Sequence, residues 1–420
     1  MDGPVIRRDP PLRRQHPPPL FATCRTGISR RSACLYGTNP IVSPAPDGVR
    51  PLARSVFFPH METTMNQEDK KKTTGFDATR RTTLLGGLAM ATTALTAKAQ
   101  SFDFKASQRY PDPNVQVLDN SFLKYRLYSS TVEQLATGFR WVEGPVWFGD
   151  GRYLLFSDIP NNRIMRWDEV TGTTSVFRNP ANFTNGLARD RQGRLIACEH
   201  LTRRITRTEY DGRITVLADN YNGKRFNSPN DIICKSDGSI WFTDPPFGIA
   251  GEWEGDKQTS ELPHAVYRID GQSGKLSLIT DALAGPNGLA FSPDEKVIYI
   301  VESRATPNRL IWAYQLTDNG TKLGSRTLAV DAAGAGAIDG FKVDVDGNLW
   351  CGWGSNGALD AKPAELDGVR VFTPQGKAIG HIHLPERCPN LVFGGAKKNR
   401  LFMASSHSLY AVYVDTRGAV

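Results

Sequence analysis

The chain carries, at residues 285–294, the stretch Gly285-Pro286-Asn287-Gly288-Leu289-Ala290-Phe291-Ser292-Pro293-Asp294, and close variants of it recur along the sequence. Each variant opens with an acidic residue or an asparagine, usually followed by glycine and then by an apolar run of strand length. By subtraction, the opening residues lie 42, 45, 57, 52 and 51 residues apart. Repeats of this length, each forming one four-stranded blade, are typical of a β-propeller. The opening residues are Glu143, Asn185, Asn230, Asn287, Asp339 and Asn390.

Each repeat contains further strand-like runs separated by hairpin turns such as Asp150-Gly151 and Asp346-Gly347. The last repeat has only three such runs before the chain ends at Val420. Residues 131–136, ahead of the first repeat, are expected to supply the missing fourth strand and so remove an exposed sheet edge. We therefore predict an all-β fold, a six-bladed β-propeller over residues 100–420, closed by pairing its two ends.

The first hundred residues have a different character. Residues 1–64 are rich in Pro and Arg without periodicity, which predicts a disordered or untranslated extension. Residues 65–99 have the pattern of a twin-arginine signal peptide, with Arg80-Arg81 before an apolar run and Ala97-Lys98-Ala99 at the cleavage site. The apolar run is too short for stable membrane insertion. This pattern predicts recognition by the Tat export machinery and a periplasmic protein.

The distribution of charge argues against a nucleic-acid partner. The formal net charge is +8, yet residues 1–99 hold 15 Lys and Arg against 7 Asp and Glu. The rest of the chain therefore holds 36 basic and 36 acidic residues. A neutral body gives no electrostatic reason to bind a polyanion. Its four cysteines form no CxxC pair, so we expect buried free thiols and no thiolate zinc site.

The innermost strands of a propeller line its central channel, so the six opening residues are expected to meet at one mouth. Two carboxylates with several side-chain amides suit a hard cation. Calcium is the expected ion, with Mg²⁺, Mn²⁺ or Zn²⁺ as alternatives. The competing interpretation is that Asn-Gly and Asp-Gly serve only as turn formers. The ends of the second strands are expected at the same rim, namely Asp158, His200, Asp244, Ser303, Trp353 and His407.

Residues 139–414 resemble the gluconolactonase/regucalcin (SMP-30) family of six-bladed propellers. The resemblance implies metal-dependent hydrolysis of lactones or related esters, with Glu143, Asn287 and Asp339 as metal ligands. It also implies that Asn230 faces the metal or the substrate. An arginine close before that asparagine is expected in the family, whereas Arg225 here precedes Asn230 by five positions. The matching motifs are Trp141-Val142-Glu143-Gly144-Pro145, Asn227-Ser228-Pro229-Asn230-Asp231, Pro286-Asn287-Gly288-Leu289 and Ile338-Asp339-Gly340.

The expected chemistry is attack of water on a sugar lactone whose carbonyl is polarised by the metal ion. We assign the catalytic base to Asp339, which would also bind the metal with Glu143, Asn230 and Asn287, and we keep Glu143 as a second candidate base. Asn185, His200 and Asn230 are the expected substrate-binding residues.

Long loops at residues 245–263 and 355–366 follow second strands, so both are expected on the metal side and should set the substrate range. Two other functions remain open at this point. One is hydrolysis of aryl esters or phosphotriesters. The other is a non-catalytic propeller that binds calcium or another ligand.

Overall fold

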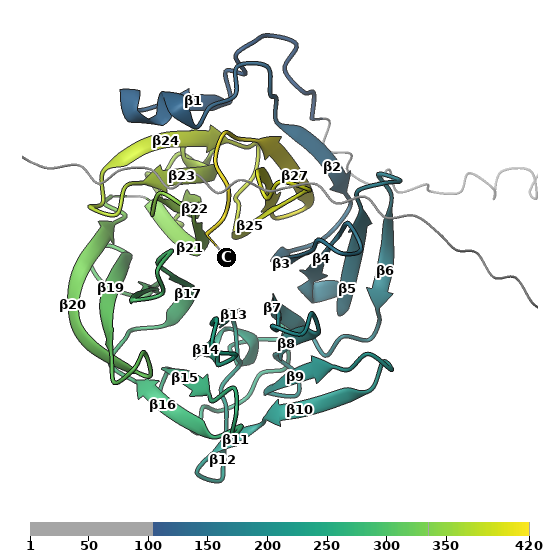
Figure 1. The fold of residues 1–420 in the computed structure, drawn as a ribbon, viewed down its shortest axis with the longest axis vertical. Coiled ribbons are helices and arrows are strands. Elements are labelled where there is room, and N and C mark those ends of the chain that lie inside the picture. The colour runs from purple at the N-terminus through teal and green to yellow at the C-terminus, as the bar shows by residue number, and fades with distance from the viewer. Residues whose placement is uncertain (1–103, 335, 420) are drawn as a thin grey trace, which may run out of the picture. The chain divides into compact units, whose positions relative to one another are not determined.

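Residues 104–334 and 336–419 are described by the computed structural model, in which six antiparallel sheets surround a central channel (Figure 1). The predicted extension at residues 1–64 and signal segment at residues 65–99 lie outside these residues. Blades one to three are β3 (Val142–Phe148), β4 (Tyr153–Asp158), β5 (Arg163–Asp168) and β6 (Thr174–Arg178); β7 (Thr184–Arg189), β8 (Leu195–Glu199), β9 (Arg204–Thr208) and β10 (Ile214–Ala218); and β13 (Ile232–Cys234), β14 (Ile240–Asp244), β15 (Ala265–Ile269) and β16 (Leu276–Thr280).

The remaining three blades complete the ring, so the predicted number of six is confirmed. Each blade begins at the channel and runs outward, and the first strand of every repeat is the innermost (Figure 1). Blades four to six are β17 (Pro286–Phe291), β18 (Val297–Glu302), β19 (Leu310–Thr317) and β20 (Lys322–Asp331); β21 (Gly336–Val343), β22 (Leu349–Ser355), β23 (Gly368–Phe372) and β24 (Ala378–His383); and β25 (Asn390–Gly394), β26 (Arg400–Ala404), β27 (Ser408–Tyr413) and β2 (Glu133–Thr137).

The ring closes as the sequence predicts. Strand β2 pairs antiparallel with β27, and Glu133 lies opposite Ala411. A segment ahead of the first repeat thus completes the last blade. One strand was not expected: β1 (Val115–Val117) adds a fifth strand to blade five by pairing with β24. In blade six, β2 covers the edge that β27 would otherwise expose.

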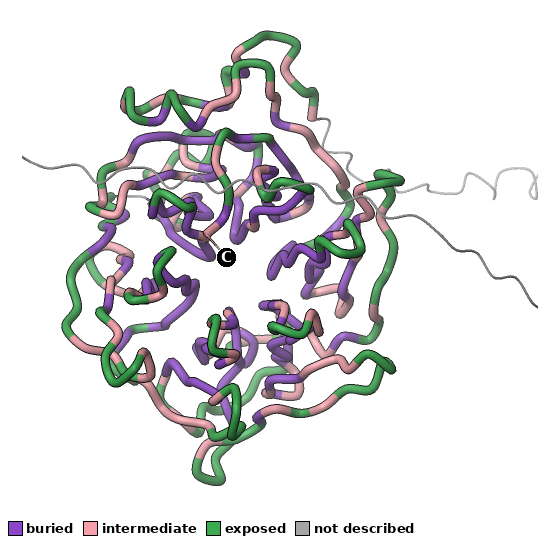
Figure 2. Tube along the Cα trace, viewed as in Figure 1, coloured by how far each residue is buried: buried purple, intermediate pink, exposed green. Residues whose placement is uncertain are grey.

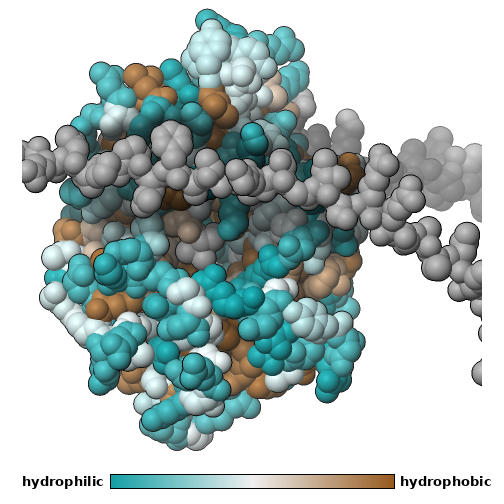
Figure 3. Space-filling view, viewed as in Figure 1, coloured by the Kyte–Doolittle hydropathy of each residue, from teal (hydrophilic) through white to brown (hydrophobic). Residues whose placement is uncertain are grey.

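The core lies between neighbouring blades, and Figure 2 shows buried residues gathered in the inner strands and exposed ones in the outer strands and loops. Trp147 of β3 stacks on Phe402 of β26 with ring centroids 5.3 Å apart, which joins blades one and six. The visible face carries mostly hydrophilic residues, with hydrophobic ones in small separate areas (Figure 3). Cys198, Cys234, Cys351 and Cys388 are buried free thiols, as predicted.

The helices are short and lie in connections between strands. None of them, over the residues described, has the length and apolar character needed to cross a membrane. The helices are η2 (Asn120–Lys124), η3 (Ile159–Asn161), η4 (Phe247–Ile249) and α2 (Pro363–Leu366), and a small hairpin is formed by β11 (Asn220–Tyr221) and β12 (Lys224–Arg225).

The repeated glycine has a steric cause. A Cβ atom at Gly144 would overlap the backbone carbonyl of Asn185 in the next blade, and one at Gly288 would press on the carbonyl of Asp339. Neighbouring inner strands therefore approach closely just after the opening residue. In four blades the pairing of the first two strands also shifts register at this point. Such a bulge re-aims a side chain, and here it leaves Asn185, Asn287 and Asp339 without a partner in the ladder, whereas Glu143 still pairs with Ser157.

Replacing Gly144 by alanine is expected to lower the free energy of unfolding by about 2–4 kcal/mol. Gly144 has a φ of +53°, so alanine would add left-handed strain to the overlap with Asn185. Urea unfolding measures the loss. Gly172→Ala is the matched control, because Gly172 has a φ of +68° and a Cβ added there would meet no atom within 4 Å. Equal losses in the two variants would contradict the close approach of the strands as the cause.

Candidate functional site

The opening residues meet at a cavity of about 380 Å³ at one end of the channel. Five of the six line it, each from a different blade: Glu143, Asn185, Asn230, Asn287 and Asp339. The sixth, Asn390, acts through a neighbour, because its Nδ2 donates a hydrogen bond to Glu143 Oε2 at 3.0 Å. The convergence expected from the repeat is therefore present in the structure.

Glu143 is a buried carboxylate with no cationic partner among the residues described. Its Oε2 accepts hydrogen bonds from the Gly144 backbone N–H at 2.9 Å and from Asn390. Burial, followed by the negative charge of Asp339, raises the pKa of Glu143 well above its usual value. A buried group of this kind is costly to ionise unless a positive charge lies nearby.

Asp339 is held from two sides. Its Oδ1 accepts a hydrogen bond from Asn287 Nδ2 at 2.7 Å, and its Oδ2 pairs with Arg387 Nη2 at 2.9 Å. Arg387 in turn donates to the Ser355 carbonyl at 3.0 Å, which fixes the guanidinium. The carboxylate is thus oriented before any ligand arrives, and the amide of Asn287 turns its nitrogen toward Asp339.

The donor set fits a divalent hard cation. Among the residues described, Glu143 Oε1 and the side-chain oxygens of Asn230 and Asn287 accept no hydrogen bond, and all three residues line the cavity. Two carboxylates with amide oxygens match the ligand preference of calcium. In the same residues no three His, Cys, Asp or Glu side chains gather as a metal-binding group, so amides have to complete the set.

Glu254 is a functional candidate that sequence reasoning missed. It lies in the loop at residues 245–263, which was correctly expected at this mouth, and it lines the cavity together with Phe247 of the same loop. Burial, followed by the charge of Asp339, raises the pKa of Glu254 to about 7. A carboxyl group that titrates near neutral pH can exchange a proton with a substrate or a water molecule. No repeat marks its position in the sequence.

His200 does not line the cavity, contrary to the substrate contact expected from the sequence. Its side chain is completely buried, and its Nδ1 lies 3.0 Å from the backbone carbonyl oxygen of Glu254. Burial lowers its pKa to about 4, so it is neutral. The end of β8 does return to this mouth, but the loop at residues 245–263 covers it. His200 therefore supports the loop that presents Glu254.

The other rim residues are also mostly covered. Ser303 alone among the second-strand ends lines the cavity. Asp158 is buried, and its Oδ2 lies 2.8 Å from Arg163 Nη2. Asp244 is also buried, and its Oδ2 accepts a hydrogen bond from the Asn227 backbone N–H. Of the two long loops, that at residues 355–366 supplies no lining residue within the described part of the chain. The alternating direction of the strands predicted six second-strand ends at the rim. Fewer reach the cavity because loops cover several of these ends.

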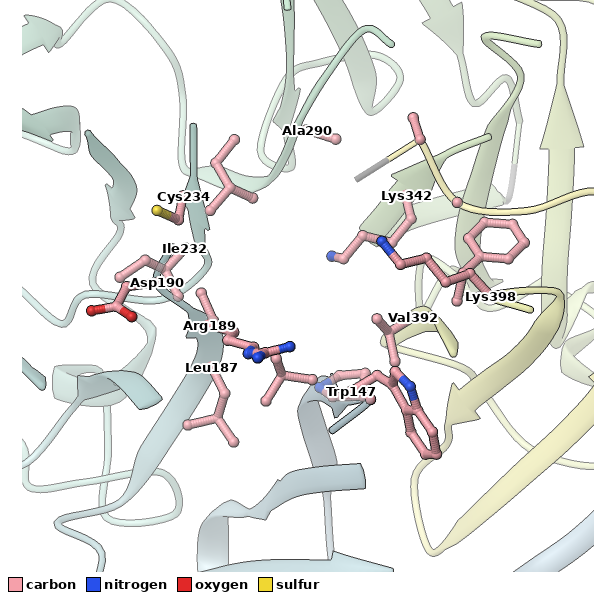
Figure 4. A pocket seen from close by; sticks show the side chains of 18 of the residues that line it. Trp147, Leu187, Arg189, Asp190, Ile232, Cys234, Ala290, Lys342, Val392 and Lys398 are labelled. Carbon is pink, nitrogen blue, oxygen red and sulfur yellow. The ribbon is translucent and has the colours of Figure 1, made fainter. Parts of the chain in front are cut away.

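A larger cavity of about 610 Å³ lies at the opposite end of the channel, where the inner strands finish. Figure 4 shows the charged groups of Arg189, Lys342 and Lys398 pointing into this space beside Trp147 and Val392. None of the opening residues lines it. The smaller cavity is the better candidate for chemistry, because it alone brings Glu143 and Asp339 together.

Comparisons with known proteins identify the family of this chain. Residues 141–407 match the family described as SMP-30/Gluconolactonase/LRE-like region. The chain is 35% identical over 314 residues to a gluconolactonase of Zymomonas mobilis, covering 69% of this chain and 83% of the relative. It is 36% identical to a solved gluconolactonase from Xanthomonas campestris, with a TM-score of 0.64 over 71% of this chain and 94% of the other.

A calcium-binding regucalcin from Agrobacterium tumefaciens shares the fold, with 18% identity and a TM-score of 0.54 over 68% of this chain and 94% of the other. The matched region begins at Trp141 and includes every opening residue from Glu143 to Asn390. The chain therefore belongs to the SMP-30/gluconolactonase/LRE-like family.

Proposed function

We propose that this protein is a lactonase that opens sugar lactones at the 380 Å³ cavity with the help of a divalent cation, calcium first. One observation carries the proposal: Glu143, Asn230, Asn287 and Asp339 come from four different blades to one cavity, in a member of a family that contains gluconolactonases. Calcium is favoured by the oxygen-only donor set and by the calcium-binding regucalcin in the family.

The proposed ligands are Glu143, Asn287 and Asp339, with Asn230 facing either the ion or the substrate. The ion, when bound, polarises the lactone carbonyl and stabilises the developing oxyanion. The protein contributes an ordered set of oxygens: Asn390 fixes Glu143, and Arg387 fixes Asp339.

Two carboxyl groups are candidates for taking the proton of the attacking water. Asp339 is the base expected from the sequence, but both of its oxygens already accept hydrogen bonds. Glu254 lines the same cavity and its pKa lies near 7, so it changes protonation in the working range. We assign the proton transfer to Glu254 and retain Asp339 as the alternative.

Substrate hydroxyl groups need hydrogen-bond partners at the mouth. Asn185 lines the cavity, and its side chain makes no hydrogen bond among the residues described. Asn230 has the same property and can bind the sugar when it is not a ligand of the ion. Phe247 gives an apolar wall against which a sugar ring can pack.

The test is acid release at constant pH from a panel of sugar lactones, with an aryl ester and a phosphotriester for comparison. Protein freed of metal by a chelator should be inactive, and calcium, magnesium, manganese and zinc are added back separately. We expect calcium to restore lactone opening. Calcium binding without turnover on any ester would instead support a binding propeller, and restored activity only on the phosphotriester would support the other hydrolase.

We also propose export through the Tat machinery to the periplasm, on the strength of Arg80-Arg81 and the apolar run that follows. Cell fractionation of the protein and of the double variant Arg80→Lys, Arg81→Lys tests this proposal. Both should be made in equal amount, and only the unaltered chain should reach the periplasm. Equal export of both proteins would overturn it.

A further inference from the structure

The same cavity is lined by arginines as well as by the carboxyl groups of Glu143, Glu254 and Asp339. Three arginines line it: Arg304 and Arg309 from the connection between β18 and β19, and Arg387 from the segment before β25. Arg387 is committed to Asp339 and to the Ser355 carbonyl. Arg304 lies over the ring of Phe247, with 5.1 Å from the guanidinium carbon to the ring centroid. That contact holds the second arginine at the wall of the cavity.

Arg309 is the uncommitted member of this group. It is half-buried, and its guanidinium makes neither a hydrogen bond nor an ion pair with any residue that the structure describes. Its backbone is fixed, because the Arg309 carbonyl accepts a hydrogen bond from the Ala332 N–H at 2.9 Å. Burial, followed by the charge of Arg387, lowers its pKa, and the charge of Arg304 acts in the same direction. The charge of Asp339 acts in the opposite direction, but Asp339 is already paired with Arg387, so an anion bound at Arg309 would relieve the remaining repulsion.

We infer that the substrate is a lactone that carries a second, anionic group, a carboxylate or a phosphate, which Arg309 binds with help from Arg304. A planar guanidinium presents paired N–H donors that match either group. This inference rests on the proposed lactonase function and deepens it. The connection between β18 and β19 would hold this second, anionic group of the substrate, while the lactone carbonyl faces Glu143 and Asp339.

The alternative role for Arg309 is to stabilise the carboxylate that forms when any lactone opens. The two roles differ in one measurable way. An arginine that acts on the reacting group affects neutral and anionic lactones alike. An arginine that binds a separate anion changes the ratio between them.

The experiment compares gluconolactone with its phosphate ester at the terminal hydroxyl and with glucarolactone, using the purified protein at one fixed concentration of the divalent ion. We expect kcat/KM to be higher for the two anionic lactones and to fall with added salt for these two alone. In Arg309→Gln the ratio of anionic to neutral kcat/KM should fall by about 10- to 100-fold, mainly through KM. Arg309→Lys should restore part of the ratio, because the charge remains.

Arg213→Gln is the matched control, since Arg213 is exposed on the turn between β9 and β10 and pairs with Asp211. Its ratio should equal that of the unaltered protein. An unchanged ratio in Arg309→Gln, with neutral lactones still opened, would overturn the anion-binding role and leave the lactonase function intact. Failure to open any of the three lactones would overturn both.

Discussion

Replacing Glu143 by glutamine is expected to lower kcat/KM for lactone opening by about a thousandfold and to abolish tight binding of calcium. Glutamine keeps the shape of the side chain but removes one of the three carboxyl groups that line the cavity. A residue that holds the ion in place helps to stabilise the oxyanion of the transition state. Loss of such stabilisation lowers the rate by a factor of order 10²–10³ or more. Titration calorimetry with calcium and the constant-pH assay measure the two effects.

The raised pKa of Glu143 gives the variant a second signature. A carboxyl group whose folded-state pKa is raised destabilises the folded state as pH rises above its unfolded value. The metal-free protein should therefore lose stability as pH rises above about 4.5, the ordinary pKa of a glutamate, and Glu143→Gln should lose less. Glu209→Gln is a suitable control, because Glu209 pairs with Arg194 and Arg207 at the outer hairpin of blade two. Normal calcium binding by Glu143→Gln would contradict the ligand assignment.

Replacing Glu254 by glutamine is expected to lower kcat by about 10²–10⁴-fold while leaving calcium binding nearly unchanged. The group acts in its ionised form, so activity of the unaltered protein should fall as pH drops through the pKa of Glu254. That pKa is about 7 without the ion, and a bound cation favours the carboxylate and moves the acidic limb below pH 7. In the pH profile of the variant's residual activity, this fall at acidic pH should be absent.

Glu252→Gln provides a matched control for this experiment. Glu252 lies in the same loop, two positions earlier, and is exposed without lining the cavity. Its variant should keep the kcat and the pH profile of the unaltered protein. If Glu254→Gln also keeps both, and Asp339→Asn loses turnover while still binding calcium, the base is Asp339, as expected from the sequence.

The repeat made the fold and the convergence of the opening residues on one cavity predictable. Spacing of the opening residues fixed six blades, and the missing last strand located the closing strand β2 near residues 131–136. Because inner strands of a propeller start at one mouth, Glu143 and Asp339 could be placed together while 196 positions apart in the sequence. The recurrent glycine also follows from this geometry, since a Cβ at Gly144 would overlap the next blade.

The substrate side of the cavity could not be predicted in the same way. Glu254 lies in a loop of blade three and Arg309 in a loop of blade four, and neither loop is part of the repeat. No pattern in the sequence therefore marks which of their side chains point into the cavity. His200 illustrates the converse error, because its strand position was right but a loop covers it. Strand β1 was missed since three residues carry too little pattern to distinguish a strand from a connection.

The most direct measurement of the central claim is a crystal structure of the protein grown with calcium, in which anomalous scattering locates the ion. We expect one ion in the 380 Å³ cavity, bound by side-chain oxygens of Glu143, Asn287 and Asp339. The side-chain oxygen of Asn287, whose Nδ2 donates a hydrogen bond to Asp339 in the present structure, would then face the ion. An ordered ion elsewhere, with Asp339 still held only by Asn287 and Arg387, would contradict the proposed metal site.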